Sequence, residues 1–375
     1  MKILCVIDSF GSGGAQRQMI GLAIGLKKRG HHVELFNYLP HYDFYRSDII
    51  QAGVVIHECI KKSKFSLRPV FTLLKLLKKQ NYDIALSFLT VPNIFLELAH
   101  LLTLKTTIIA SERSNHQGTK SLPFHRFLHV LSSHVVVNSR NHQQWLIKNH
   151  SYIKNKLTVI YNGVDLEKFN FSQPRMKEKC NLNLLTVGRI GVEKNILNVV
   201  RALIIFYQKY EWVPRLDLVG RNDESPKGLK YLQEIRLLLN QNPEVKSKVR
   251  FLGQRNDVHL LIRDYDALLH PSLYEGLPNA ICEALSSGRP VLASNVCDNG
   301  ILIEDGKRGF LFEPKSPASI QGAMQRFCSM GQTYYEEMCS NSRSYAEESL
   351  SYDKMVNSFE TLFYSFKKSS PNQKS

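Results

Sequence analysis

Short apolar runs alternate with longer segments of helical periodicity along most of the chain. The run KILCVID (2–8) is typical of a buried strand, and AQRQMIGLAIGLKKRG (15–30) predicts a helix that ends at Gly30. Further strands are predicted at 31–38, 82–89, 105–111, 134–139 and 157–162. Strands that alternate with helices through short turns predict a parallel sheet with helices on both faces.

The polar segment 166–181 interrupts this rhythm and is interpreted as a linker. The alternation then restarts, with strands predicted at 182–190, 214–220, 249–254, 266–272 and 290–294 and helices near 194–210 and 227–240. The fold class predicted is therefore α/β, with two doubly wound, Rossmann-like domains (1–170 and 171–350) facing a cleft. A helical stretch over about 315–368 exceeds what the second domain needs. One hypothesis is that 351–375 holds a C-terminal helix crossing back to the first domain, then a polar tail.

Composition supports a globular protein with two ordinary cores, since 43% of its 375 residues are hydrophobic. No apolar run approaches the roughly 20 residues that span a membrane. The N-terminus, with its short apolar part and early glycines, predicts a first strand rather than a signal peptide. The 7 cysteines are scattered without a CxxC pair, which favours reduced, buried thiols in a cytoplasmic protein.

The net charge of +16 is concentrated in residues 1–170, which hold 22 Lys and Arg against 10 Asp and Glu. Zinc-ligand spacings and aromatic-rich RNA-binding patterns are absent from the sequence, so nucleic acid is not the expected partner. In the segment 61–80, Phe71, Leu74 and Leu77 fall at helical spacing among several lysines. The segment could be a basic amphipathic helix on an anionic membrane, or an ordinary surface helix with its apolar side in the core.

Two loops that follow predicted strands carry residues suited to phosphate. Gly11, Gly13 and Gly14 lie between a strand and a helix, where glycine permits close approach to an anion, although a tight turn alone would need the same residues. Their spacing is neither the dinucleotide fingerprint nor a P-loop. Arg189 and Lys194 flank a second loop and would suit a diphosphate that gains charge as it leaves, or they are solvated surface cations.

Glu275 and Glu283 stand eight positions apart in HPSLYEGLPNAICEALSSG (270–288). Pro278 is suited to the first turn of a helix that continues to about Ser287. Glu275 would then precede the helix and Glu283 lie within it, and a carboxylate accepts two hydroxyl hydrogen bonds, as sugars and ribose require. The alternative is a capping glutamate followed by an exposed helical one.

Four segments together resemble the family 4 retaining glycosyltransferases. PSLYEGLPNAICEALSSGRPVLAS resembles that family's E-x7-E segment, VGRIGVEKN its diphosphate motif, VIYNGVDLEKF its Asn-Gly-Val-Asp motif, and GSGGAQRQ its glycine loop. The matches follow the family's order over about residues 1–315. The resemblance implies a GT-B fold, a nucleotide-sugar donor and transfer with retention of configuration.

The resemblance also implies roles for the matching residues. Glu275 would contact donor-sugar hydroxyls, Glu283 the ribose, and Arg189 and Lys194 the diphosphate. Glu275, Arg189 and Lys194 are thus the catalytic candidates, and the donor-binding candidates are Gly13, Gly14, Gly276, Leu277, Pro278, Asn279 and Glu283. The loop 253–255 would border the base. No cofactor or metal is expected, although Asp264–Asp266 formally matches the D-x-D metal motif of another transferase fold.

One segment departs from the family pattern. IIASERSNHQG stands where many members carry a His-Asp pair and looks like a branch that includes transferases of amino sugars. Glu112, Arg113 and His116 are therefore acceptor-side or donor-sugar candidates, while the leaving phosphate would assist deprotonation of the acceptor. Cys297 also replaces a more usual glycine.

The leading hypothesis is a glycosyltransferase of surface-polysaccharide biosynthesis. It would move a sugar, with N-acetylhexosamine as one candidate, from a UDP-sugar to a lipid-linked glycan, as a cytoplasmic protein in peripheral contact with the anionic inner face of the membrane. The alternatives are a sugar-nucleotide epimerase or phosphorylase of the same fold, and a non-catalytic nucleotide-sugar or lipid-binding protein.

Overall fold

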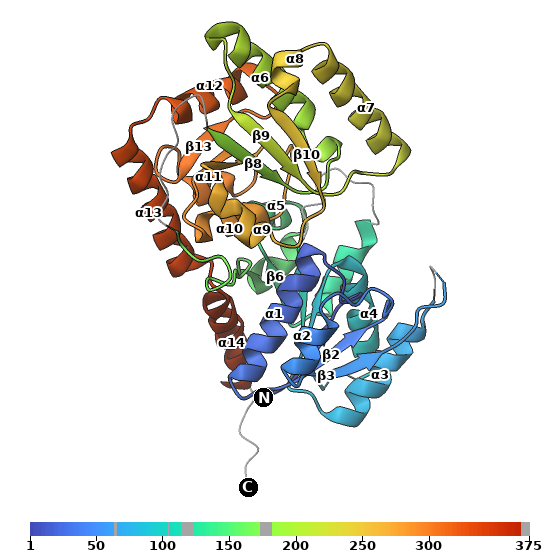
Figure 1. Ribbon diagram of the computed structural model, residues 1–375. Coiled ribbons are helices and arrows are strands. Elements are labelled where there is room, and N and C mark those ends of the chain that lie inside the picture. The colour runs from blue at the N-terminus through green and yellow to red at the C-terminus, as the bar shows by residue number, and fades with distance from the viewer. Residues whose placement is uncertain (64–65, 104, 114–122, 173–181, 369–375) are drawn as a thin grey trace. The chain divides into compact units, whose positions relative to one another are not determined.

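The computed structural model describes residues 1–63, 66–103, 105–113, 123–172 and 182–368. The chain divides into two compact units, Met1–Gly163 with Tyr352–Ser375, and Val164–Ser351. The sequence placed these boundaries at 170 and 350. Each unit contains one all-parallel sheet with helices on both faces (Figure 1), so the predicted α/β architecture with two doubly wound domains is confirmed.

The first unit is built on a seven-stranded sheet of order β3-β2-β1-β4-β5-β6-β7. Its strands are β1 (Lys2–Val6), β2 (His32–Asn37), β3 (Val55–Glu58), β4 (Ile84–Phe88), β5 (Thr107–Glu112), β6 (His134–Val137) and β7 (Leu157–Val159). Its helices are α1 (Gly14–Lys28), α2 (Arg46–Gln51), α3 (Arg68–Gln80), α4 (Thr90–His100), η1 (Pro123–Val130), α5 (Arg140–Asn149), η2 (Ser151–Lys156) and α14 (Tyr352–Lys368).

Alternation along β1 explains why this sheet is covered on both sides. Ile3 and Cys5 face one core, which α1 and α14 complete, while Leu4 and Val6 face another, which α3 and α4 complete. The strand β3 was not predicted, because its four residues are exposed or half-buried at an edge of the sheet and form no apolar run.

Helix α14 returns to the first unit and packs against α1, beside which it lies in Figure 1. The close approach depends on glycine. A Cβ atom at Gly21 would lie 2.6 Å from the ring of Tyr352, and one at Gly25 would lie 2.5 Å from Val356 Cγ2. The predicted helical stretch 315–368 is thus three helices, of which the last belongs to the first unit.

The second unit contains a six-stranded sheet of order β10-β9-β8-β11-β12-β13 around one large core. Its strands are β8 (Asn183–Val187), β9 (Arg215–Val219), β10 (Val249–Gly253), β11 (Ala267–His270), β12 (Val291–Ser294) and β13 (Gly309–Phe312). Its helices are η4 (Val192–Lys194), α6 (Ile196–Tyr210), α7 (Pro226–Asn240), α8 (Pro243–Lys246), α9 (Val258–Leu261), η5 (Ile262–Asp264), α10 (Asn279–Ser286), α11 (Asn299–Ile303), α12 (Pro317–Cys328) and α13 (Gln332–Ser349).

The predicted linker 166–181 is packed onto the second unit as far as Ser172, where its described part ends. Arg289 Nη2 donates to Ser172 Oγ at 2.8 Å, and Arg343 Nη1 donates to the carbonyl oxygen of Phe169 at 3.1 Å. The sequence could not show that this stretch is packed, because its hydrogen-bond partners Arg289 and Arg343 lie more than a hundred residues later in the chain.

Candidate functional site

The second unit brings two of the predicted catalytic residues into contact. Lys194 ends the short helix η4 that follows β8, and Glu275 lies in the loop between β11 and α10. Because β8 and β11 are neighbours in the parallel sheet, these loops emerge at the same edge, and Lys194 Nζ donates to Glu275 Oε1. Both side chains retain access to solvent, with exposed fractions of 18% and 19%.

Glu275 has two further partners that the sequence did not indicate. Ser272 Oγ donates to Glu275 Oε1 at 2.9 Å, and His270 Nε2 lies 3.2 Å from the same oxygen. Burial by itself would raise the pKa of Glu275, but the hydrogen bond from His270 and the charge of Lys194 hold it well below its usual range. Glu275 is therefore a carboxylate at any working pH, suited to accepting hydrogen bonds and not to releasing a proton.

Arg189 is exposed and lies apart from this contact. Its guanidinium forms an ion pair with Glu193, in which Nη2 lies 2.6 Å from Glu193 Oε1, and this partner raises its pKa. Because 48% of the Arg189 side chain is exposed, the pair contributes little stability and a ligand can compete for the guanidinium. The structure thus places Arg189 and Lys194 on one short loop of the second unit.

The remaining donor-binding candidates of the second unit surround the start of α10. Gly276, Leu277 and Pro278 complete the loop, and α10 begins at Asn279 without a side-chain cap. Glu283 lies inside α10 and is 5% exposed. The predicted loop-then-helix setting of the two glutamates is confirmed, with the helix running from Asn279 to Ser286.

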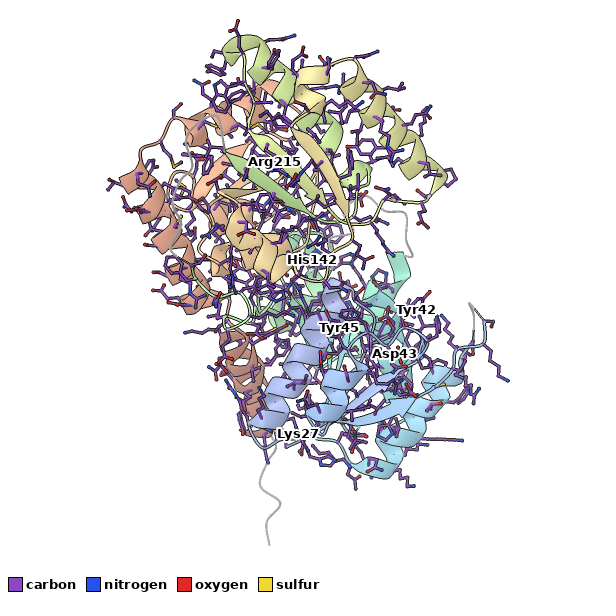
Figure 2. The ribbon with its side chains drawn as sticks, viewed as in Figure 1. Lys27, Tyr42, Asp43, Tyr45, His142 and Arg215 are labelled. Carbon is purple, nitrogen blue, oxygen red and sulfur yellow. The ribbon has the colours of Figure 1, made fainter. Side chains whose placement is uncertain are left out.

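The glycine loop of the first unit leads directly into α1. Gly13 is the N-cap of α1 and Gly14 its first residue, with no side-chain cap and no acidic residue in the first turn. The loop is bordered by the segment Tyr42–Tyr45, labelled in Figure 2, through backbone hydrogen bonds from Phe10 N to Tyr42 O and from Tyr45 N to Phe10 O. An uncapped helix N-terminus carries partial positive charge, so the loop is compatible with an anion.

Glu112 is held by cationic and histidine partners within the first unit. Arg126 Nε, His129 Nε2 and His142 Nε2 (His142 is labelled in Figure 2) lie 3.0, 2.9 and 2.8 Å from its carboxylate oxygens. His129 Nδ1 also lies 2.6 Å from Glu97 Oε1. We call these five residues the Glu112 cluster. The sequence showed no link between them, since they come from α4, β5, η1 and α5.

Charge balance explains the cluster's protonation. Burial alone would raise the pKa of Glu112, but its histidine partners hold it well below the usual range. Burial likewise would lower the pKa of His129, yet hydrogen bonds to the two carboxylates raise it to about 9. With its carboxylate occupied by protein groups, Glu112 is better suited to holding η1 and α5 against β5 than to contacting a ligand.

Arg113 has a different environment from its neighbour. Its guanidinium lies over the ring of Phe88, with 3.8 Å between Cζ and the ring centroid, and Nη1 donates to Asn162 Oδ1 at 3.1 Å. Burial lowers the pKa of Arg113 to about 9. His116, the third acceptor-side candidate, lies outside the described residues.

Two further expectations concern the second unit: the formal metal motif at Asp264–Asp266, and the loop 253–255 that would border the base of the donor. Among the described residues, no group of three or more His, Cys, Asp or Glu side chains could hold a metal ion. Asp266, part of the D-x-D match, accepts from Asn183 N at 2.7 Å and has 3% exposure, which is typical of a structural residue. The loop 253–255 follows β10, an edge strand of the sheet, and its role beside a base stays a prediction.

Two family models match the chain. The model described as Glycosyltransferase Family 4 matches residues 12–168, and the model described as Glycosyl transferases group 1 matches residues 181–329. Together they cover most of both units.

Two curated relatives match the chain over about three quarters of its length. The Escherichia coli UDP-Gal:alpha-D-GlcNAc-diphosphoundecaprenol alpha-1,3-galactosyltransferase is 28% identical over 301 residues, 75% of this chain and 76% of that protein. The Campylobacter jejuni N-acetylgalactosamine-N,N'-diacetylbacillosaminyl-diphospho-undecaprenol 4-alpha-N-acetylgalactosaminyltransferase is 24% identical over 314 residues, 78% of this chain and 80% of that protein.

Solved structures match nearly the whole fold. A glycosyltransferase from Rickettsia africae superposes with a TM-score of 0.83 at 20% identity, covering 98% of this chain and 99% of that one. Anabaena HepE in complex with UDP gives a TM-score of 0.82 at 19% identity, covering 97% and 100%. At these identities the likeness establishes the fold, which is GT-B as the sequence predicted.

Proposed function

This chain is a glycosyltransferase that belongs to family 4, and from that premise we propose that it transfers a sugar from a UDP-sugar to a lipid-linked glycan with retention of anomeric configuration. The family membership rests on the two matching models and on the curated relatives. The donor class is supported by the UDP that HepE binds and by the UDP-Gal that the E. coli relative uses. The acceptor class is supported by the diphosphoundecaprenol-linked substrates of both relatives.

The contact between Lys194 and Glu275 is the observation that carries the proposal. Two motif residues 81 positions apart meet at the carboxyl edge of one parallel sheet, where ligands of such folds bind. A cation beside a permanently ionised carboxylate can bind two parts of one donor, a phosphate and a sugar hydroxyl. Neither group needs a metal ion for this.

The proposed reaction breaks the bond between the sugar C1 and the donor's diphosphate oxygen and forms one from C1 to an acceptor hydroxyl oxygen. Lys194 and Arg189 stabilise the charge that develops on the departing UDP, Glu275 holds the sugar, and Glu283 holds the ribose. The acceptor proton passes to the leaving phosphate. Because Glu275 stays ionised, it serves as a hydrogen-bond acceptor throughout.

Peripheral contact with an anionic membrane, on its inner face, is a further part of the proposal. No helix of the described chain is long and apolar enough to cross a membrane. On α3, Leu73 and Leu77 are buried in the core, as the surface-helix interpretation predicts. The opposite side of this region nevertheless exposes Leu67 at 55% and Phe71 at 56%.

Charge favours the same surface. Arg68, Lys75, Lys78 and Lys79 are exposed on α3 around Phe71. Apolar side chains that protrude among lysines suit the headgroup region of an anionic bilayer.

The transfer reaction is tested with the purified protein, radiolabelled UDP-sugars and GlcNAc-diphosphoundecaprenol as acceptor, and the label is measured in the organic phase. Wild-type protein should transfer label from at least one UDP-sugar, and Glu275→Ala should lose transfer by about a hundredfold or more while keeping its unfolding temperature. Near-normal transfer by Glu275→Ala would refute the assigned role. A wild-type protein that binds no UDP-sugar would refute the donor class.

Membrane contact is tested by sedimentation with vesicles of phosphatidylglycerol or of phosphatidylcholine. The double variant Leu67→Ser/Phe71→Ser should bind the anionic vesicles several-fold less than wild type. Leu237→Ser is a matched control, because Leu237 is 54% exposed on α7 of the second unit. Equal binding by all three proteins would exclude α3 as the contact.

A further inference from the structure

The side-chain donors that contact the carboxylate of Glu275 all reach the same one of its two oxygens. Lys194 Nζ, Ser272 Oγ at 2.9 Å and His270 Nε2 at 3.2 Å all contact Oε1. No side chain that the structure describes donates to Oε2, and 19% of the Glu275 side chain is exposed. The carboxylate is thus held by one oxygen and presents the other.

The two holding groups on β11 and its loop are themselves fixed. His270 is 2% exposed and Ser272 is fully buried, and Ser294 Oγ donates to the carbonyl oxygen of Ser272 at 2.6 Å. The thiol of Cys297 donates to the carbonyl oxygen of Glu275 at 2.8 Å. Cys297 has a φ of 51°, a left-handed conformation in which glycine is the less strained residue. The backbone and the side chain of Glu275 are therefore both restrained.

The geometry also determines which nitrogen of His270 carries hydrogen. Glu275 is ionised and only accepts, and the Ser272 hydroxyl gives its hydrogen to Oε1. Nε2 must then be the protonated nitrogen, pointing toward Glu275 Oε1 and Ser272 Oγ, which lies 3.1 Å away. Burial lowers the pKa of His270, so the imidazole is a neutral donor at physiological pH.

Lys194 differs from the other two donors because it has a second task. In the proposed reaction, a diphosphate at the η4 loop would attract its ammonium away from Glu275 as the donor binds. His270 and Ser272 have no such competing ligand in the proposed reaction. In a donor-bound state they would therefore be the groups that keep Glu275 in place.

We propose that His270 and Ser272 are positioning residues that hold Glu275 by Oε1, so that Oε2 accepts a hydrogen bond from a hydroxyl group of the donor sugar. The inference rests on the proposed function and extends it to two residues that do not touch the substrate. A carboxylate that is fixed before the sugar binds loses less conformational entropy on binding and discriminates hydroxyl positions more sharply.

The test separates binding of the sugar from binding of the nucleotide. Calorimetry first measures the affinity of wild-type protein for UDP, UDP-glucose, UDP-galactose, UDP-N-acetylglucosamine and UDP-N-acetylgalactosamine. The UDP-sugar that wild type binds most tightly is then used for the variants. Ser272→Ala and His270→Leu should weaken UDP-sugar binding by about tenfold, since each loses a hydrogen bond to a charged group, and leave UDP binding unchanged.

Conservative variants distinguish positioning from folding. Ser272→Thr keeps the hydroxyl and His270→Gln keeps an N–H donor, so both should bind the UDP-sugar within about threefold of wild type. Ser286→Ala is the matched control. It removes a buried hydroxyl whose only partner within the described part of the chain is the Cys282 carbonyl oxygen, at 2.8 Å within α10. It should bind both ligands as wild type does.

Each other outcome overturns the inference in a recognisable way. Unchanged UDP-sugar affinity in Ser272→Ala and His270→Leu would refute positioning while leaving the proposed function intact. Equal losses for UDP and UDP-sugar would show that the two residues support the fold alone. If wild-type protein binds UDP but binds no UDP-sugar more tightly than UDP, Oε2 does not hold a donor sugar. If it binds neither UDP nor any UDP-sugar, the proposed function fails as well.

Discussion

The protonation of His129 makes a quantitative prediction about the stability of the first unit. The imidazole is fully buried, with Nδ1 2.6 Å from Glu97 Oε1 and Nε2 2.9 Å from Glu112 Oε1. Its pKa is about 9 when folded and 6.5 when free, because the two carboxylates outweigh the effect of burial. A raised folded pKa contributes stability that is fully present below pH 6.5 and is lost as the pH rises through 9. At about 1.4 kcal/mol per pKa unit, the contribution is on the order of 3 kcal/mol.

Tryptophan fluorescence can follow the unfolding of the first unit. The chain has 2 tryptophans, Trp145 in the first unit and Trp212 in the second. Trp145 contacts the Glu112 cluster, since Arg126 Cζ lies over its ring, 4.8 Å from the ring centroid. In a Trp212→Phe background, fluorescence therefore follows unfolding of the first unit alone.

Urea unfolding at pH 6 and pH 10 then compares His129 with His129→Gln in that background. The variant should be less stable at pH 6, and the difference in unfolding free energy should shrink by about 3 kcal/mol at pH 10. Groups that do not contact His129 titrate alike in both proteins and largely cancel. A difference that does not change with pH, or that grows toward pH 10, would refute the charged pairing of His129 with the two carboxylates.

Three further predictions concern packing, the diphosphate and pH. Gly25→Ala should lower the unfolding temperature of the first unit by several degrees, because the new Cβ would lie 2.5 Å from Val356 Cγ2. The control Gly322→Ala in α12 should be neutral or stabilising, because its Cβ meets no atom within 4 Å. Calorimetric scans in which Gly322→Ala lowers the unfolding temperature more than Gly25→Ala would contradict this packing. Lys194→Gln should weaken UDP binding by about tenfold or more, whereas the control Lys209→Gln, on α6 of the same unit, should bind UDP as wild type does. If calorimetric titration gives the two variants equal affinities for UDP, Lys194 does not bind the diphosphate. The pKa of Glu275 is lowered, so its charge is present above pH 4.5 and is lost only as the pH falls further. Titration of Glu275 should therefore not weaken UDP-sugar binding between pH 8 and pH 5. A loss of affinity over this range in wild type that is absent in Glu275→Gln would count against permanent ionisation of Glu275.

Much of the fold was predictable from sequence because it depends on local pattern. Buried parallel strands are continuous apolar runs, as in β1 and β8, and helices such as α1 and α6 repeat their apolar positions every three or four residues. Edge strand β3 lacks such a run and was missed. The α3 segment was predicted less well, because Phe71, Leu74 and Leu77 do not form one face: Leu77 is buried, whereas Phe71 is 56% exposed. Leucines at the other positions, such as Leu73, complete the buried face instead.

The candidate site was only partly predictable for a related reason. Motif spacing singled out Lys194 and Glu275, although it did not show that their side chains meet. His270 and Ser272 lie within five residues of Glu275, at the end of a buried strand. This position could have predicted that their side chains contact Glu275. The Glu112 cluster left no such signal, since Glu97 and His142 lie 45 positions apart.

By itself, then, the amino-acid order determined most of the strands, the longer amphipathic helices, the two-unit architecture and the loops that carry polar groups, because these follow from periodicities of a few residues. Only the tertiary structure decided which groups touch: three donors on Oε1 of Glu275, two carboxylates on His129, and α14 against the glycines of α1. The physical reason is that protonation state and hydrogen-bond capacity depend on neighbours in space. Parallel strand order places residues side by side whose separation in the chain reveals nothing of their contact.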